Sequence, residues 1–307
     1  MFLRQFHYLV SLEQEEHFGR AARRCNVSQP SLSSAIKQLE EELEIPIVLR
    51  HQRFQGFTDE GRRVLEWAKR ILADRDAMIE ELSIMHRNLH GNLRIAAMPM
   101  SSPVVPVINH MFAEQHPAVQ IDIRFVGIDR LKTGLTNFEF DAGVTYLDHQ
   151  PLGRLKTLPL YEGQMSLLVP DNGWLGDRTE VTWSEAAELP LCLLHTVTHE
   201  RQIVDEAFAS VGCQPRPRVE ADSMINLAFH VMQGELATII PAHFITLIGA
   251  FAGTRQVRLV EPVISQRVGL VWTGSSPMLP MTKALVDVLQ NAVESGDLGR
   301  RLADPRE

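Results

Sequence analysis

The sequence has few cysteines and no long apolar run. Three cysteines, Cys25, Cys192 and Cys213, are spread over 307 residues, and none belongs to a C-x-x-C pair. That spacing argues against a disulfide framework and a structural zinc site, and it fits a reducing compartment. No apolar stretch approaches the roughly 18 residues of a membrane-spanning helix, and the N-terminus lacks the basic start of a signal peptide. We therefore expect a cytoplasmic protein without membrane contact.

Motifs of common enzymes are also missing. The sequence contains no G-x-S-x-G, no H-E-x-x-H and no glycine-rich phosphate loop. His195 and His199 lie four residues apart with Glu200 beside them, but a third metal ligand at a suitable spacing is missing. We expect no catalytic residues, no metal and no cofactor. Two functional classes are kept as alternatives to the interpretation developed below. One is an enzyme. The other is a small-molecule-binding protein, which would explain residues 92–307 but not the first ninety.

The acidic balance of the chain limits what can be said about its partners. The net charge is −8, so a nucleic-acid partner must be argued from local charge. Acidic residues exceed basic ones almost entirely after residue 90. Residues 1–90 have the pattern of helices, whereas short apolar runs alternate with helical segments from Gly91 onward, which is typical of a parallel sheet with crossover helices.

Two helices separated by a tight turn are predicted within residues 18–43. The first buries a face of small residues, and the second buries a stripe that begins at Leu32 and ends at Leu43. Ser28 is placed to cap the second helix, and Pro30 lies in its first turn, where a missing N–H is harmless. Such a pair is typical of a helix-turn-helix, whose second helix enters the major groove of DNA.

The outer face of that second helix carries short polar side chains on its first two turns. Short side chains let a helix approach base edges and phosphates, and glutamine can bind adenine with two hydrogen bonds. We therefore expect DNA contacts from seven residues: Ser28, Gln29, Pro30, Ser31, Ser33, Ser34 and Lys37. The alternative is a helical bundle with an exposed polar face.

An irregular stretch, VLRHQRFQGF, follows with Arg50 and Arg53. An arginine-tipped hairpin beside a helix-turn-helix indicates a wing that contacts the DNA backbone or minor groove. The alternative is that both arginines are simply solvated.

A long helix is predicted next, capped by Thr58. Its apolar positions repeat in steps of four and three over about four heptads, which is typical of a coiled coil. We expect a homodimer through this helix and, because a two-fold protein reads two half-sites, a two-fold symmetric operator in double-stranded DNA. The alternative is that the stripe packs on its own chain.

The runs HFGRAARRCNVSQPSLSSAIKQLEEEL and RHQRFQGFTDEG resemble the LysR-type transcriptional regulators. The resemblance implies an α + α/β fold and no enzymatic activity. A winged helix-turn-helix (1–58) and a long linker helix (59–90) would precede a two-lobed α/β effector domain (91–307) that resembles type 2 periplasmic binding proteins. Its subdomain I would cover about 92–162 and 267–307, and its subdomain II about 163–266. The family usually forms tetramers, and RNA polymerase is a further candidate partner. The sequence departs from the family pattern at two positions. Glu44 stands where the family usually has Gly, and Ser34 stands where it often has Arg.

Loops that follow the predicted strands supply the candidate effector contacts, because ligands bind at the carboxyl ends of strands between two lobes. From the first lobe we expect Met100, Ser101, Ser102, Gly127, Ile128, Thr145 and Tyr146. From the second lobe we expect His195, Thr196, Val197, Thr198, Pro241 and His243. Hydroxyls and helix N-termini favour a small organic anion. For any single residue, an ordinary helix cap is the alternative, and no arginine is assigned to this pocket.

Overall fold

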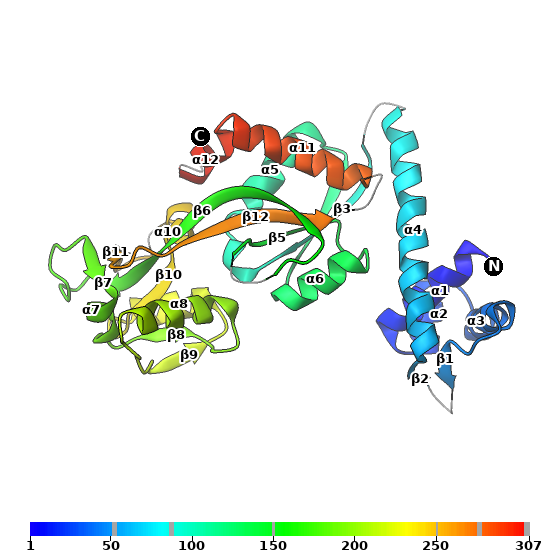
Figure 1. Cartoon of the computed structure of the whole chain (residues 1–307), viewed down its shortest axis with the longest axis horizontal. Coiled ribbons are helices and arrows are strands. Elements are labelled where there is room, and N and C mark those ends of the chain that lie inside the picture. Colours follow the sequence, from blue (N-terminus) through cyan, green and yellow to red (C-terminus); the bar gives the residue numbers. More distant parts are fainter. Residues whose placement is uncertain (51–53, 86–88, 149–150, 250, 275–277, 304–307) are drawn as a thin grey trace.

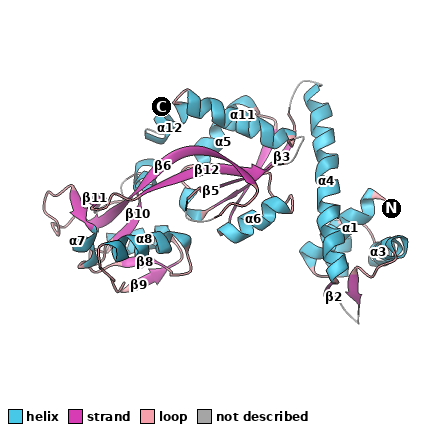
Figure 2. Cartoon of the chain, in the orientation of Figure 1, coloured by secondary structure: helices cyan, strands magenta, loops and turns pink. Residues whose placement is uncertain are grey.

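The computed structural model describes residues 1–50, 54–85, 89–148, 151–249, 251–274 and 278–303. It confirms the predicted architecture: a small helical unit with a two-stranded hairpin, one long helix, and an α/β unit made of two lobes (Figures 1 and 2). None of the helices in these ranges is long and apolar enough to cross a membrane.

The N-terminal unit contains three helices and the hairpin. Its elements are α1 (Leu3–Glu15), α2 (Phe18–Arg24), α3 (Gln29–Leu43), β1 (Val48–Arg50) and β2 (Phe54–Phe57). Leu32, Ile36 and Leu39 on the inner face of α3 are fully buried, as their helical spacing predicts. They join Leu9, Leu12 and other residues in one core.

Local hydrogen bonds fix both ends of these helices. The Ser28 hydroxyl accepts a hydrogen bond from the Ser31 backbone N–H, which confirms the predicted cap of α3. At the start of α2, where the sequence offers no serine, the imidazole Nδ1 of His17 accepts from the N–H groups of Gly19 (3.0 Å) and Arg20 (3.3 Å). Glu44 ends α3 in the left-handed conformation with a φ of 56°.

Helix α4 (Asp59–Met85) divides its apolar stripe between two environments. Near its start, Leu65, Ala68 and Leu72 are buried in the core of the N-terminal unit. Farther along, Met78, Ile79 and Leu82 are 56%, 51% and 52% exposed. The alternative that the stripe packs on its own chain therefore holds for the first half of the helix, and the second half leaves an apolar surface uncovered.

The first lobe, lobe I, is built on a mixed sheet. Three parallel strands, in the order β4-β3-β5, are joined by β12 and the first part of β6 in antiparallel fashion. The bounds of the strands are β3 (Gly91–Ala97), β4 (Val119–Phe125), β5 (Ala142–Tyr146), β6 (Leu155–Pro170) and β12 (Ser265–Thr273). The helices of this lobe are η1 (Pro99–Ser101), α5 (Val105–Gln115), α6 (Ile128–Thr136), α11 (Pro280–Glu294) and α12 (Asp297–Ala303).

The second lobe, lobe II, is built on the other end of β6. Residues Leu155–Gln164 of β6 pair with β12, whereas Met165–Pro170 pair with β10 and β11. The remaining strands are β7 (Glu180–Thr182), β8 (Cys192–Leu194), β9 (Val219–Ala221), β10 (Thr238–Pro241) and β11 (Thr254–Val260). The helices are α7 (Trp183–Ala187), α8 (His199–Ser210), α9 (Met224–Met232) and α10 (Ala242–Ile248).

A buried lysine connects the N-terminal unit to lobe I. The Lys69 side chain of α4 is only 6% exposed, and its ammonium lies 2.8 Å from a carboxylate oxygen of Glu13 in α1. It also lies 3.4 Å from Glu139, which follows α6 and forms an ion pair with Arg130. Burial alone would raise the pKa of Glu139, but the Arg130 hydrogen bond and the Lys69 charge outweigh it and hold this pKa below 4.5.

We predict that Lys69→Met lowers the free energy of unfolding at pH 7 by about 1–3 kcal/mol, because two partly buried carboxylates lose their cation. The contribution of Glu139 is complete above pH 4.5 and is lost as the pH falls through its lowered folded-state pKa. The difference between the wild type and the variant in urea unfolding should therefore shrink below that pH. Lys283→Met, at an exposed position of α11, is the control. Equal losses in both variants would contradict this role.

Candidate DNA-binding surface and effector site

The first turns of α3 present a polar face to solvent. Ser28, Gln29, Ser31, Ser34 and Lys37 are exposed, as is Pro30, and Ser33 is partly buried. The Ser28 and Ser31 hydroxyls lie 2.7 Å apart, so both are partly satisfied within the helix end. Lys37 forms a surface ion pair with Glu41 at 3.4 Å, which is weak in water and can be exchanged for another anion. The side chains of Gln29 and Ser34 form no hydrogen bond within the described ranges, so both are available to a partner.

The predicted wing is the hairpin of β1 and β2. Arg53 lies outside the described residues, and of Arg50 the structure describes only the backbone, in β1. A T-shaped contact between Phe18 and Phe54, with ring centroids 6.1 Å apart, places the hairpin beside the start of α2. This puts the hairpin within the same unit as α3, as the helix-turn-helix arrangement requires.

Glu40 fastens this hairpin to α3, a role that the sequence reasoning missed. One of its carboxylate oxygens accepts hydrogen bonds from the backbone N–H groups of Ile47 (2.8 Å) and Val48 (2.9 Å). Gly61 at the start of α4 lies against the same segment, because a Cβ there would be 2.1 Å from the Ile47 carbonyl oxygen. Thr58 accepts from the Gly61 N–H at 2.8 Å, which confirms its predicted capping role.

Most of the candidate effector residues of lobe I are packed inside it. Met100, Ser101, Thr145 and Tyr146 are buried at the carboxyl ends of β3 and β5. The Ser101 hydroxyl donates to the Met98 carbonyl at 2.7 Å, and the Thr145 hydroxyl to the Met98 sulfur at 2.9 Å. Ser102 is half-buried. Gly127 is the exposed N-cap residue of α6, and Ile128 packs against a separate apolar cluster.

The candidates of lobe II are similarly divided. His195, Thr196 and Val197 are exposed, and Thr198 caps α8 by accepting from the Arg201 N–H. Thr198 thus fits the alternative of an ordinary helix cap. Pro241 is buried at the end of β10. The His243 ring lies beside Tyr161, with Nε2 3.3 Å from the phenol oxygen.

Met100 meets lobe II at a small cavity of about 10 Å³, room for about one water molecule. The other lining residues are Met165, Leu193, Leu194, Glu200, Arg201, Val204, Met224 and Ile239. Nearby, the rings of Tyr146 and His199 approach across the lobes with centroids 5.6 Å apart. The two lobes are therefore closed on each other at this point, and of the predicted residues only Met100 lines the cavity.

The charged residues of this cavity could not be assigned from the sequence. Arg201 is buried there, although no arginine was assigned to the pocket, and its guanidinium binds Asp205 at 2.7 Å, Glu220 at 2.6 Å and the Leu194 carbonyl at 2.7 Å. These partners leave it little charge to offer a ligand. Glu200 is 6% exposed, and its Oε1 has no hydrogen-bond partner in the described ranges. Burial raises the pKa of Glu200 and lowers that of His243 to about 4, so His243 is neutral at pH 7.

The arrangement of a helix-turn-helix with a hairpin, a long helix and two lobes can be compared with known proteins. Residues 3–62 match the lysR family of bacterial regulatory helix-turn-helix proteins, and residues 86–294 match the LysR substrate binding domain. The chain belongs to the LysR family. This LysR-type protein is therefore a DNA-binding transcription regulator and not an enzyme, and it acts in the cytoplasm, where bacterial DNA lies.

Individual relatives align over nearly the full length of this LysR-type regulator. A hydrogen peroxide-inducible genes activator of Pectobacterium carotovorum subsp. carotovorum is 25% identical over 296 residues, covering 96% of this chain and 97% of that protein. A full-length OxyR variant from Pseudomonas aeruginosa is 26% identical with a TM-score of 0.76, covering 94% of this chain and 95% of that one. CbnR in complex with its target DNA shares the fold, with a TM-score of 0.68 and 18% identity. The match covers 95% of this chain and 100% of the CbnR chain.

We predict that Glu200→Gln stabilises the protein at pH 8. Because burial raises the folded-state pKa of Glu200 above 4.5, ionisation destabilises the fold, and this penalty develops as the pH rises from 4.5 through the folded-state pKa. The variant should have a higher urea midpoint than the wild type at pH 8 and the same midpoint at pH 4. Glu188→Gln, at an exposed position of lobe II, should change neither. A lower midpoint for Glu200→Gln at pH 8 would contradict the assignment.

Proposed function

We propose that this LysR-type regulator binds a two-fold symmetric operator as a homodimer, and that a small effector in the cleft between the lobes modulates operator binding or DNA bending. The observation that carries the proposal is the exposed polar face of α3, capped by Ser28 and fastened to the hairpin by Glu40. A helix end with exposed, short polar side chains suits phosphates and base edges.

The proposed base contact is Gln29, supported by Ser33, Ser34 and Lys37 on the same face. Ser28, Pro30 and Ser31 form the end of the helix, where the exposed hydroxyls of Ser28 and Ser31 are proposed to contact phosphate. Arg50 and Arg53 are proposed to contact the backbone from the hairpin. Under the alternative, a helical bundle whose polar face has no DNA partner, the protein would show no specific binding to an operator.

We predict that Gln29→Ala lowers operator affinity by about 1–3 kcal/mol without lowering the thermal midpoint of unfolding, because it removes a base contact from an exposed position. The operator fragment would come from the DNA immediately upstream of the gene, located by footprinting in modest salt. Gln202→Ala, an exposed glutamine on α8, should bind like the wild type. Normal operator binding by Gln29→Ala would count against the role, and no footprint at any concentration would remove the operator proposal.

The proposed dimer contact is the uncovered second half of the α4 stripe, Met78, Ile79 and Leu82. Three large apolar side chains that are half-exposed on one helix gain free energy when a second helix covers them. Covering by the same surface of a second copy satisfies two-fold symmetry. Further assembly into tetramers is carried over from the family expectation.

We predict that Leu82→Glu raises the dimer dissociation constant by at least about tenfold, because it places a charge in an apolar contact. Sedimentation velocity at a series of protein concentrations measures this. Val263→Glu, which changes a 51% exposed apolar residue in another part of the molecule, is the matched control. Unchanged dimerisation of the Leu82 variant would place the contact elsewhere.

The proposed effector binds without covalent chemistry, although relatives are named for hydrogen peroxide. Thiol oxidation needs an accessible thiolate. Cys192 is buried, with a pKa raised to about 11 by burial, and Cys25 packs 3.1 Å from the Ser11 hydroxyl in the N-terminal unit. Neither they nor Cys213 line the interlobe cavity. A small anion, as expected from the sequence, would require Glu200 to be protonated, which its raised pKa favours.

A further inference from the structure

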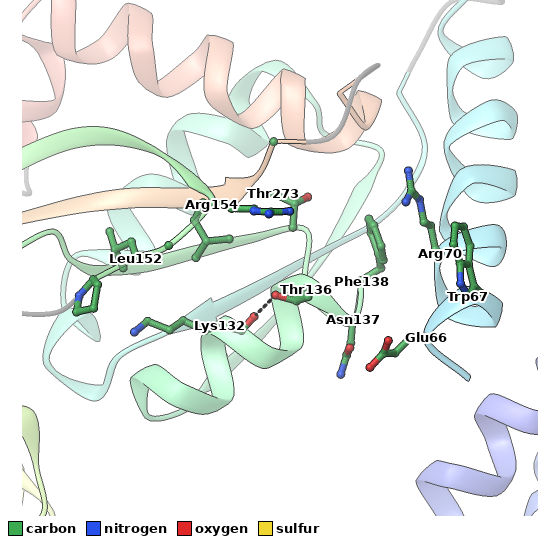
Figure 3. A pocket seen from close by; sticks show the side chains of 14 residues that line it. Glu66, Trp67, Arg70, Lys132, Thr136, Asn137, Phe138, Leu152, Arg154 and Thr273 are labelled. Carbon is green, nitrogen blue, oxygen red and sulfur yellow. Dashed lines mark hydrogen bonds between the residues drawn. The ribbon is translucent and has the colours of Figure 1, made fainter. Parts of the chain in front are cut away.

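We propose that the groove between α4 and lobe I, here called the α4 groove, is a second ligand site, and that it takes a small aromatic anion. The groove has a volume of about 800 Å³, within the range of about 300–1,000 Å³ that is usual for small-molecule sites (Figure 3). One wall is α4, and the other is formed by the end of α6 and the segment that leads into β6. No residue is shared with the interlobe cavity.

Cationic side chains gather around the α4 groove. Arg70 comes from α4, Lys132 from α6, and Arg154 from the segment before β6, whereas Glu66 is the single acid among the lining residues. Within the part of the chain that the structure describes, none of these three cations forms an ion pair with a carboxylate. By contrast, the buried Arg201 is paired twice. Unpaired cations around one concave surface create a positive potential that attracts anions.

Aromatic rings stand on both walls of the α4 groove. Trp67 of α4 is 60% exposed, which is high for the largest apolar side chain, and the Arg70 guanidinium lies 5.5 Å from the centre of its ring. On the other wall, Phe138 has a φ of 56°, in the left-handed region that bulky residues rarely adopt. Figure 3 shows both rings in the same gap.

The chemistry of the two walls defines the ligand. Flat faces of Trp67 and Phe138 favour an aromatic body, and Arg70 and Arg154 favour a carboxylate or similar anionic group. Asn137 and Thr273 add uncharged hydrogen-bonding groups. Because the walls belong to α4 and to lobe I, a bound ligand would stabilise the arrangement in which these two units lie together, the same arrangement that Lys69 supports.

Titration calorimetry of the full-length protein with phenylacetate tests this site. We expect phenylacetate to bind. Phenylacetamide, which lacks the charge, and cyclohexylacetate, which lacks the aromatic ring, should each bind at least about tenfold more weakly. Arg70→Gln and Arg154→Gln should each weaken phenylacetate binding by about tenfold, the loss of one charged hydrogen bond. Arg218→Gln, an exposed arginine of lobe II, and Glu200→Gln in the interlobe cavity should leave the affinity unchanged.

Three results would overturn the proposal. The first is no binding of phenylacetate at millimolar concentration. The second is binding that responds to Glu200→Gln but not to Arg154→Gln, since this would assign the anion to the interlobe cavity. The third is a change in dimer dissociation caused by Arg154→Gln without any effect on phenylacetate, since this would make the groove a contact between subunits. None of these measurements depends on operator binding.

Discussion

The geometry of the effector half depends on one strand, β6, which belongs to both lobes. Nine of its first ten residues pair with β12 in lobe I, and its last six pair with β10 and β11 in lobe II. Any change in the angle between the lobes must therefore bend β6 near Gln164 and Met165. Gly163 lies at this point, where a Cβ would be 3.2 Å from the His243 ring, so α10 can pack closely against the strand.

The apolar stripe of helix α4 is used differently along its length: its first half is buried in the N-terminal unit, and its second half is exposed. Leu65, Ala68 and Leu72 complete the core of the helix-turn-helix unit, so the reading face of α3 is held by the first half of α4. Met78, Ile79 and Leu82 remain exposed and form the proposed dimer contact. Between these halves Lys69 and the α4 groove connect the helix to lobe I. One helix thus links the proposed DNA-reading surface, the proposed dimer contact and lobe I, so that a change at one of them could act on the others.

Pairing, rather than net charge, decides which basic residues can act on partners. In lobe I, Arg94 is bound to Asp141, and Arg267 is bound to Asp148, each through more than one hydrogen bond. In lobe II, Arg201 is occupied in the same way. These cations contribute to the fold and are not available to ligands. The cations without such partners in the described ranges include those of the α4 groove, and their distribution could not be deduced from the sequence.

The sequence by itself determined the helix-turn-helix, because caps and helical periodicity depend on residues a few positions apart. Ser28, Pro30, Thr58 and the buried face of α3 are features of this kind, and the structure confirms the first and third as caps. Tertiary structure alone decided how the α4 stripe is shared, that Glu40 holds the hairpin, and that Glu200 and Arg201 rather than the loop hydroxyls line the interlobe cavity. These features depend on contacts between chain segments brought together only by packing, and no local pattern of residues specifies which side chains will meet there.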